Sequence, residues 1–290
     1  MSKLPYYARR VLSEAWSRAT PRYRVRAGSR SLSIPGGTPA GARLLRDWSP
    51  NWKTSVIGHF LGRRSGAFID IGTNIGQTLL DFYEAKGPQS RYIGFEPNPS
   101  CVEMMNAIIS GNRLEDATMV PVGLSGRDGL MKIYVGNTDP TDQGGTFMES
   151  LRPAKQLNSF WVPCFRFDAV LEDLGMGAGD LAFIKIDVEG AELHVLEGMK
   201  ETLAAGQVPV LCEVLHRDPQ ADEAAYRERV TAIAELVRAQ DYRIHRILRS
   251  AAQKIEGLEE VANFPQKVWD ATSGRECDYL FLPAGYETPF

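Results

Sequence analysis

The chain has 290 residues, of which 43% are hydrophobic and 24% are charged, and its formal net charge at pH 7 is −3. This composition is that of one large folded domain or two smaller ones, and it excludes a disordered, collagen-like or disulfide-framed chain. Because no apolar run reaches about 18 residues, the sequence predicts no membrane-spanning helix. The weak negative charge gives no reason to expect nucleic acid as a main partner.

The charge is unevenly distributed along the chain. Residues 1–50 carry ten lysines and arginines against two acidic residues, a net of +8, which leaves a net of −11 for residues 51–290. We therefore divide the chain into a basic N-terminal arm (residues 1–50) and a domain (residues 51–290). Such an arm can make peripheral contact with an anionic membrane, or it can fold back on its own acidic domain.

Two segments are predicted within the arm. Apolar residues at helical spacing predict a short amphipathic helix over residues 4–18, which could lie on a membrane or pack against the protein. Residues 21–39 are rich in Gly, Pro, Ser and Arg and predict a loop or linker. The four cysteines form no C-x-x-C pair and the first residues do not resemble a secretory signal, so we expect free thiols in a cytoplasmic protein, at the inner face of the membrane if the arm binds lipid.

The domain alternates continuous apolar segments with amphipathic ones. This alternation predicts an α/β fold in which a mostly parallel central sheet is covered by helices on both faces. Asn98 followed by Pro99 predicts the start of a helix. Residues 130–166 interrupt the alternation and predict an insertion over the sheet edge, with strands at 132–135 and 161–165. The strands of the main sheet are predicted at residues 67–71, 92–95, 119–124, 181–188, 208–214, 242–248 and 279–282.

Ligands of such a sheet bind outside the carboxyl ends of its strands. After the first strand, the sequence from Asp70 to Gly76 predicts a glycine turn that leads into a helix, where Gly72 permits the tight turn and Gly76 lets the helix lie close to a ligand. The N–H groups at such a helix start can hold a carboxylate or a phosphate. The dinucleotide fingerprint requires glycine where this chain has Asn74, which counts against a nicotinamide cofactor.

Two later strands end in acidic residues. Glu96 ends the second strand, where a carboxylate can accept hydrogen bonds from both ribose hydroxyls of a nucleoside. The alternative is an acid favoured by the helix dipole, but Asn98 already caps that helix, so we prefer the ribose role. Asp187 opens an acidic cluster at the end of the fourth strand; for Glu192, within that cluster, the helix dipole alone is an equally good explanation.

These motifs resemble those of the FkbM-type methyltransferases, a branch of the class I group that uses S-adenosylmethionine. The resemblance covers roughly residues 66–216 and rests on D-I-G-T-N-I-G, G-F-E-P-N-P and, most specifically, F-I-K-I-D-V-E-G-A-E-L-H-V-L-E-G. It implies a class I methyltransferase (Rossmann-like) three-layer fold. It also implies O-methylation of a hydroxyl on a sugar, a glycolipid or another small natural-product acceptor, with S-adenosylmethionine as cofactor.

The resemblance further implies a set of cofactor-binding residues. The acidic residues at the carboxyl edge of the sheet agree with this cofactor, because carboxylates offset the cost of taking the cationic sulfonium out of water. Gly72, Asn74 and Gly76 would hold the methionine part of the cofactor, and Asp70 would orient that turn or the amino group of the cofactor. Glu96 would hold the ribose and Ser125 would lie beside the adenine. Asp187 would lie near the sulfonium and the acceptor.

Methylation of an alcohol also requires a general base. We name His216, whose imidazole is available in its neutral form near pH 7, and Asp187 as the two candidates, with His216 preferred. No set of metal ligands is predicted. Three alternatives stay open at this point: a methyltransferase that acts on protein or RNA, which the basic arm allows; a nicotinamide-dependent oxidoreductase; and a binding protein that has lost catalysis.

Overall fold

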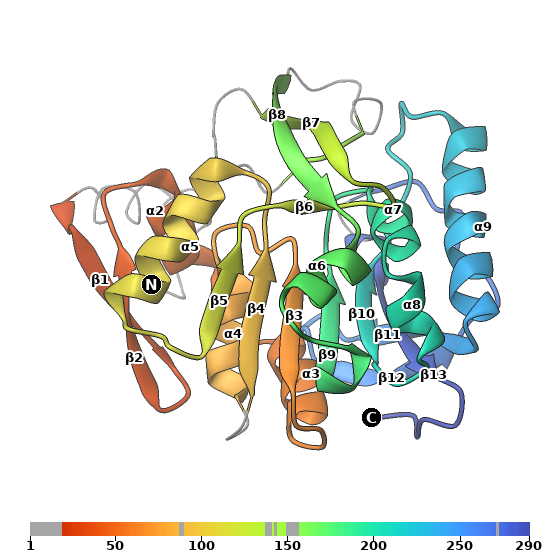
Figure 1. The fold of residues 1–290 in the computed structure, drawn as a ribbon, viewed down its shortest axis with the longest axis horizontal. Coiled ribbons are helices and arrows are strands. Elements are labelled where there is room, and N and C mark those ends of the chain that lie inside the picture. Colours follow the sequence, from red (N-terminus) through yellow and green to blue (C-terminus); the bar gives the residue numbers. More distant parts are fainter. Residues whose placement is uncertain (1–18, 87–89, 137–140, 142–143, 149–156, 271–272) are drawn as a thin grey trace.

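The computed structural model describes residues 19–86, 90–136, 141, 144–148, 157–270 and 273–290, so the helix expected over residues 4–18 lies outside the described residues. The central element is an eight-stranded sheet (Figure 1). Its strands are β3 (Ala67–Ile71), β4 (Arg91–Phe95), β5 (Ala117–Val120), β9 (Leu181–Ile186), β10 (Val210–Glu213), β11 (Tyr242–Arg249), β12 (Ile255–Glu260) and β13 (Asp278–Pro283).

The order of the strands in this sheet is β12-β11-β13-β10-β9-β3-β4-β5. The five strands from β10 to β5 are all parallel to one another, whereas β13 pairs antiparallel with both β10 and β11. The prediction of a mostly parallel central sheet is therefore confirmed. The carboxyl ends of β3, β4, β9 and β10 lie at the same edge of this sheet.

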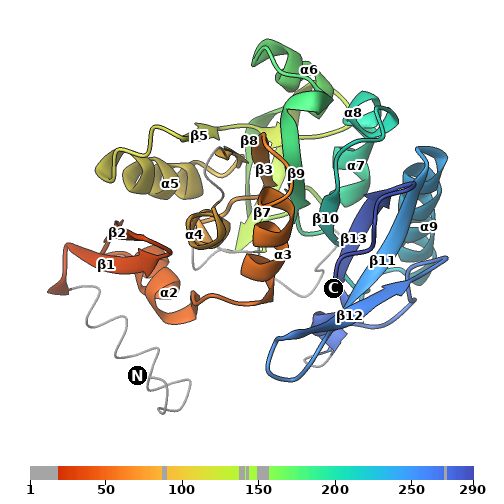
Figure 2. The ribbon, with the colours of Figure 1, turned by 90° about the horizontal axis from the view of Figure 1, so that it is seen from below.

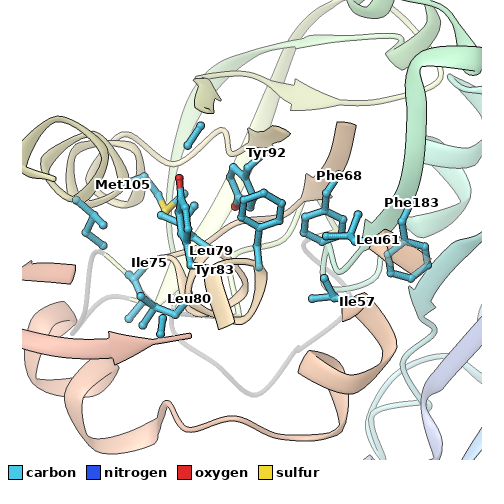
Figure 3. Packing of buried hydrophobic residues seen from close by; sticks show 14 of the residues in the cluster. Ile57, Leu61, Phe68, Ile75, Leu79, Leu80, Tyr83, Tyr92, Met105 and Phe183 are labelled. Atoms are coloured by element: carbon cyan, nitrogen blue, oxygen red, sulfur yellow. The ribbon is translucent and has the colours of Figure 1, made fainter. Parts of the chain in front are cut away.

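Helices cover both faces of the sheet (Figure 2). Successive residues of a strand point to opposite faces, and accordingly Phe68 and Phe183 belong to one buried cluster while Ile69 and Ile184 belong to the other. Figure 3 shows part of the first cluster, in which the ring of Phe68 packs against both Tyr92 and Phe183. On that face lie α3 (Trp52–Leu61), α4 (Gln77–Ala85) and α5 (Pro99–Gly111); on the other lie α6 (Phe167–Asp173), α7 (Glu192–Glu197), α8 (Lys200–Ala204) and α9 (Glu223–Ala239).

The start of α5 is where the sequence predicts it. Asn98 is the N-cap, its Oδ1 accepts a hydrogen bond of 3.1 Å from the backbone N–H of Ser100, and Pro99 occupies the first turn. Two short 3₁₀ helices, Ala178–Asp180 and Ser273–Glu276, precede β9 and β13 respectively. In the part of the chain that the structure describes, no helix combines the length and the apolar character needed to cross a bilayer.

The prediction of a loop over residues 21–39 is wrong. This segment forms an antiparallel hairpin of β1 (Arg22–Ala27) and β2 (Arg30–Pro35), followed by α2 (Pro39–Asp47). The physical reason is the alternation of arginine and serine with apolar residues, which buries one face of each strand, as Tyr23 and Leu32 show. These side chains pack in the same cluster as α4 and α5, so the hairpin shares the core of the central sheet.

The third predicted strand, residues 119–124, is also wrong as a single element. β5 ends at Val120, and Pro121 follows; a proline has no N–H to continue a ladder. The chain then forms β6 (Gly123–Leu124), which belongs to a separate three-stranded sheet with β7 (Gly129–Gly136) and β8 (Leu157–Phe165). The two strands predicted within 130–166 are confirmed, and Figure 1 shows this small sheet beyond the carboxyl ends of the central strands.

Candidate active site

A cavity of about 580 Å³ opens at the carboxyl ends of β3, β4, β9 and β10, beside the small sheet. We distinguish two halves by the residues that line them. The glycine-turn half is lined by Gly72, Thr73, Asn74, Glu96, Pro97, Asn98, Gly123 and Leu124, and the acidic half by Trp48, Trp52, Lys53, Asp81, Asp187, Glu213 and Gln253.

The glycine turn is fixed to the strands on both sides. Gly72 has a φ of 83°, in the left-handed region, and a Cβ atom there would lie 1.9 Å from the carbonyl oxygen of Asp187, so no larger residue fits without displacing β9. The N–H groups of Gly72 and Thr73 both donate to the carbonyl of Phe95, at 3.0 and 3.2 Å. The turn therefore closes against β4 and β9 at once, and the two halves of the cavity meet at Gly72 and Asp187.

Glu96 links the turn to the start of α5. Its Oε2 accepts from the backbone N–H of Asn74 and its Oε1 from that of Asn98, both at 2.9 Å. Burial raises the pKa of Glu96 to about 7, although these two N–H groups act in the opposite direction. Because each carboxylate oxygen keeps a further lone pair, Glu96 can still accept two hydrogen bonds from a ligand in the cavity.

Asp70 lies below the turn, with no exposed surface. The Tyr92 hydroxyl donates to its Oδ2 at 2.5 Å, and Lys185 Nζ lies 3.0 Å from its Oδ1. Lys185 also donates to the carbonyl of Gly72 at 2.9 Å. Burial raises the pKa of Asp70, and the Lys185 ammonium opposes that rise. Lys185 thus connects Asp70 to the glycine turn, and Asp70 is not itself among the residues that line the cavity.

Asp187 and Glu213 dominate the acidic half, and their environments differ. Asp187 lies 3.4 Å from Lys53 Nζ and 3.5 Å from Lys185 Nζ. Burial alone would raise the pKa of Asp187, but the two lysines hold it well below its usual range. Burial, reinforced by the charges of Asp187 and Asp278, raises the pKa of Glu213 well above its usual range. The two carboxyl groups share a hydrogen bond, and the raised pKa of Glu213 favours Glu213 as its donor.

Residues far apart in the chain complete the acidic half. Lys53 follows Asn51, the N-cap of α3, and although burial opposes its charge, Asp187 and Asp278 raise the pKa of Lys53. The Trp52 ring lies 5.7 Å from Lys53 Nζ and 4.2 Å from the Arg249 guanidinium carbon. Arg249 in turn forms an ion pair of 2.5 Å with Asp278. Side chains from α3, β9, β10, β11 and β13 therefore meet at one place.

The other residues named from the sequence lie away from the cavity lining. Gly76, the N-cap of α4, faces α5, where a Cβ atom would meet Met105 Sδ at 2.8 Å. Ser125 is buried, and its N–H donates to the carbonyl of Phe165 in the small sheet. His216 is 4% exposed; burial lowers the pKa of His216. Among the described residues, those that line the cavity include none of these three.

Several residues of the acidic half are not predicted as site residues from the sequence. Glu213 ends the fifth strand, so the rule that ligands bind at strand ends was a signal for it. Lys185 carried a weaker signal, as a lysine inside an otherwise apolar strand. Lys53, Arg249 and Asp278 carried none, because nothing in the sequence shows that their elements meet.

The fold and the site together indicate the class of protein. The mostly parallel sheet has helices on both faces and carries a glycine turn and a strand-end glutamate at its carboxyl edge, which is a Rossmann-like α/β arrangement. The model of the methyltransferase FkbM domain matches residues 70–244. The chain therefore belongs to the FkbM methyltransferase domain family.

Two curated relatives are similar to parts of the chain. The 2-O-methyltransferase NoeI of Sinorhizobium fredii is 31% identical over 150 residues, which are 47% of this chain and 58% of the relative. The methyltransferase sdnD of Sordaria araneosa is 26% identical over 156 residues, which are 46% of this chain and 60% of the relative. The matches thus span about three fifths of each relative's length.

Among solved structures, the methyltransferase FkbM from Methylobacillus flagellatus is similar to the chain at a TM-score of 0.45 and 13% identity, covering 94% of this chain and 58% of that one.

Proposed function

We propose that this protein is an S-adenosylmethionine-dependent methyltransferase that methylates a hydroxyl oxygen on a sugar, a glycolipid or another small acceptor. The observation that carries the proposal is Glu96, whose two oxygens are fixed by the N–H groups of Asn74 and Asn98 at the edge of a cavity within the family-matched region. That the S. fredii relative is named a 2-O-methyltransferase supports oxygen as the acceptor atom.

The residues of the glycine-turn half fit this cofactor. Glu96 has lone pairs left for two ribose hydroxyls. Asn74 lines the cavity, and its Oδ1 is buried and accepts no hydrogen bond within the described part of the chain, so it can accept one from an ammonium group. Leu124 and Pro97 offer apolar surface for a base. The acidic half suits a ligand that carries positive charge at its reacting centre.

When bound, S-adenosylmethionine supplies an electrophilic methyl group on a positively charged sulfur. The chain itself aligns the acceptor, excludes water and receives the proton that the hydroxyl loses. Ile133 and Phe147 from the region of the small sheet, together with Trp52 from α3, form apolar parts of the cavity wall. Lys53, Glu213 and Asp187 are the polar groups available to an acceptor hydroxyl in the acidic half.

Calorimetric titration of the full chain with S-adenosylmethionine, S-adenosylhomocysteine and NADH tests the cofactor. We expect the first two to bind at micromolar concentrations and NADH not to bind; binding of NADH alone would contradict the proposal.

Mass spectrometry of glycans and lipids from cells with and without the gene tests the acceptor. We expect one species to lose the mass of a methyl substitution, whereas a loss confined to RNA or protein would assign a different acceptor class.

A further inference from the structure

The Asp187–Glu213 pair is the cluster of titratable groups in the cavity that the cofactor-binding role leaves unexplained. The two side chains end neighbouring parallel strands, β9 and β10, and both line the acidic half. Since carboxylates repel each other, their hydrogen bond requires a proton, and the opposite pKa shifts of the two groups favour Glu213 as the one that holds it. A carboxyl group that holds a proton at the edge of a reaction cavity can exchange it with a ligand.

The charged groups around Glu213 explain why the proton is held there. Asp187 lies on the β9 side, and on the other side Asp278 of β13 is the register partner of Glu213. Asp278 is neutralised by Arg249 of β11, and Asp187 by Lys53 of α3. Each neighbouring carboxylate thus has its own cation, and Glu213 is the member of the cluster without an ion-pair partner within 4.0 Å among the described residues.

A positive charge that enters this cavity changes the protonation equilibrium of Glu213. In the empty cavity, the negative charges of Asp187 and Asp278 favour the neutral form of Glu213. A cation beside Asp187 acts in the opposite direction and favours the carboxylate form of Glu213. The sulfonium of S-adenosylmethionine is such a cation, whereas S-adenosylhomocysteine has the same nucleoside and amino acid but a neutral sulfur.

We propose that Glu213 is the general base of the methyl transfer and that it releases its proton to solvent when the cationic cofactor, but not the neutral product, occupies the cavity. This inference rests on the proposed function and assigns the base to a residue other than His216 or Asp187. It makes the base available only while a transferable methyl group is present.

The charges balance through the transfer. The acceptor oxygen forms the new C–O bond, the C–S bond breaks with its electron pair going to sulfur, and the hydroxyl proton passes to a carboxylate oxygen of Glu213. The positive charge lost at sulfur equals the negative charge lost at Glu213, so the net charge of the cavity stays constant. The neutral product then leaves a protonated Glu213, which is the state that burial and the charges of Asp187 and Asp278 favour in the empty cavity.

Calorimetry of the full chain with the two cofactor forms tests the proton release. Affinities are measured between about pH 5 and about pH 7, each in two buffers of different ionisation enthalpy, and the ratio of S-adenosylmethionine to S-adenosylhomocysteine affinity is followed. This ratio cancels the titration of Glu96, because both ligands carry the same ribose. We expect the ratio to rise with pH by as much as about tenfold per pH unit, with up to about one more proton released by S-adenosylmethionine.

Variants assign the effect to Glu213. In Glu213→Gln the ratio becomes independent of pH, whereas Glu235→Gln, an exposed substitution on α9, keeps the wild-type slope. Lys53→Met provides an independent readout if circular dichroism shows that Glu213→Gln is unfolded. Loss of that cation raises the pKa of Glu213 and moves the midpoint of the slope to higher pH, while Lys53→Arg leaves it in place.

Transfer of a labelled methyl group to a glycan and lipid extract of cells that lack the gene tests the role as base. We expect Glu213→Gln to lower the rate about 100-fold with S-adenosylhomocysteine affinity within about threefold of wild type. Equal pH dependence for both ligands, or wild-type transfer by Glu213→Gln, overturns the inference and leaves the proposed function intact. Failure of both ligands to bind overturns the proposed function itself.

Discussion

The two halves of the cavity are built in different ways. The glycine-turn half comes from a short stretch between Gly72 and Asn98 together with the β6 strand, and backbone hydrogen bonds and a close glycine contact hold it in place. The acidic half combines side chains from five elements, and Lys53, Arg249 and Asp278 lie outside the family-matched residues 70–244. Local backbone geometry fixes the first half, whereas long-range electrostatics sets the second.

This difference has a consequence for specificity. A turn held by backbone contacts is difficult to alter without distorting the fold, so we expect the backbone of the glycine-turn half to tolerate little change. A site built from side chains on separate elements can change through single substitutions that leave the sheet intact. We therefore expect the segments before residue 70 and after residue 244 to determine which acceptor is bound.

Gly72→Ala is expected to have the largest effect. The added Cβ atom would meet the Asp187 carbonyl at 1.9 Å on a backbone with a φ of 83°, so the free energy of unfolding should fall by about 3 kcal/mol or more. Gly177→Ala is the control, because nothing lies within 4 Å of its added Cβ atom, and it should change stability by less than about 0.5 kcal/mol. Denaturant unfolding measures both; equal stabilities would show that the turn is not tightly fixed.

Glu96→Ala should impair ligand binding in the glycine-turn half alone. It removes the acceptor for two buried N–H groups and the charged acceptor for the ribose, so S-adenosylhomocysteine should bind about 100-fold more weakly. Calorimetry measures the affinity, and thermal unfolding checks that the variant is folded. A folded Glu96→Ala protein with wild-type affinity would remove Glu96 from the cofactor site.

Lys53→Met should affect the acidic half alone. It leaves Asp187 with Lys185 as its remaining cation, and we expect methyl transfer to fall about tenfold at pH 7 while S-adenosylhomocysteine affinity stays within about threefold. Labelled transfer to the extract and calorimetry give the two values. A parallel loss of both would mean that the two halves do not act independently.

The smallest expected effect is that of pH on binding of the neutral product. Burial raises the pKa of Glu96 to about 7, and in the proposed role its charged form would accept the hydrogen bonds of the ribose hydroxyls. Affinity for S-adenosylhomocysteine should therefore weaken about fivefold as the pH falls from about 8 to about 6, because protonated Glu96 loses an acceptor. Glu96→Gln should bind more weakly, without this pH dependence; a persistent slope would assign the titration to another group.

Local patterns predicted much of the fold. The Asn98-Pro99 start of α5 and the apolar runs of β3 and β9 depend on residues that are neighbours in the chain, and all three are where the sequence places them. The β1–β2 hairpin is not predicted, because the glycine and proline residues of this segment indicate a loop while its alternation of buried and exposed residues is that of strands. Pro121 ends β5, and that break also could have been read from the sequence.

The positions of the candidate site residues are easier to predict where the backbone forms the site than where side chains from separate elements do. The turn at Gly72 and the position of Glu96 follow from a strand–turn–helix pattern. His216, in contrast, follows β10 by three residues and is not among the residues that line the cavity. No pattern along the sequence shows which of two nearby strand-end residues faces a cavity.

The sequence alone determined the alternation of strands and helices, the glycine turn and the strand-end acids, because each depends on the conformational preferences and spacing of neighbouring residues. Only the tertiary structure decided which charges meet. Lys53, Glu213 and Asp278 come together through the packing of α3, β10 and β13, and the protonation state of Glu213 depends on burial and on distances between groups that are remote along the chain.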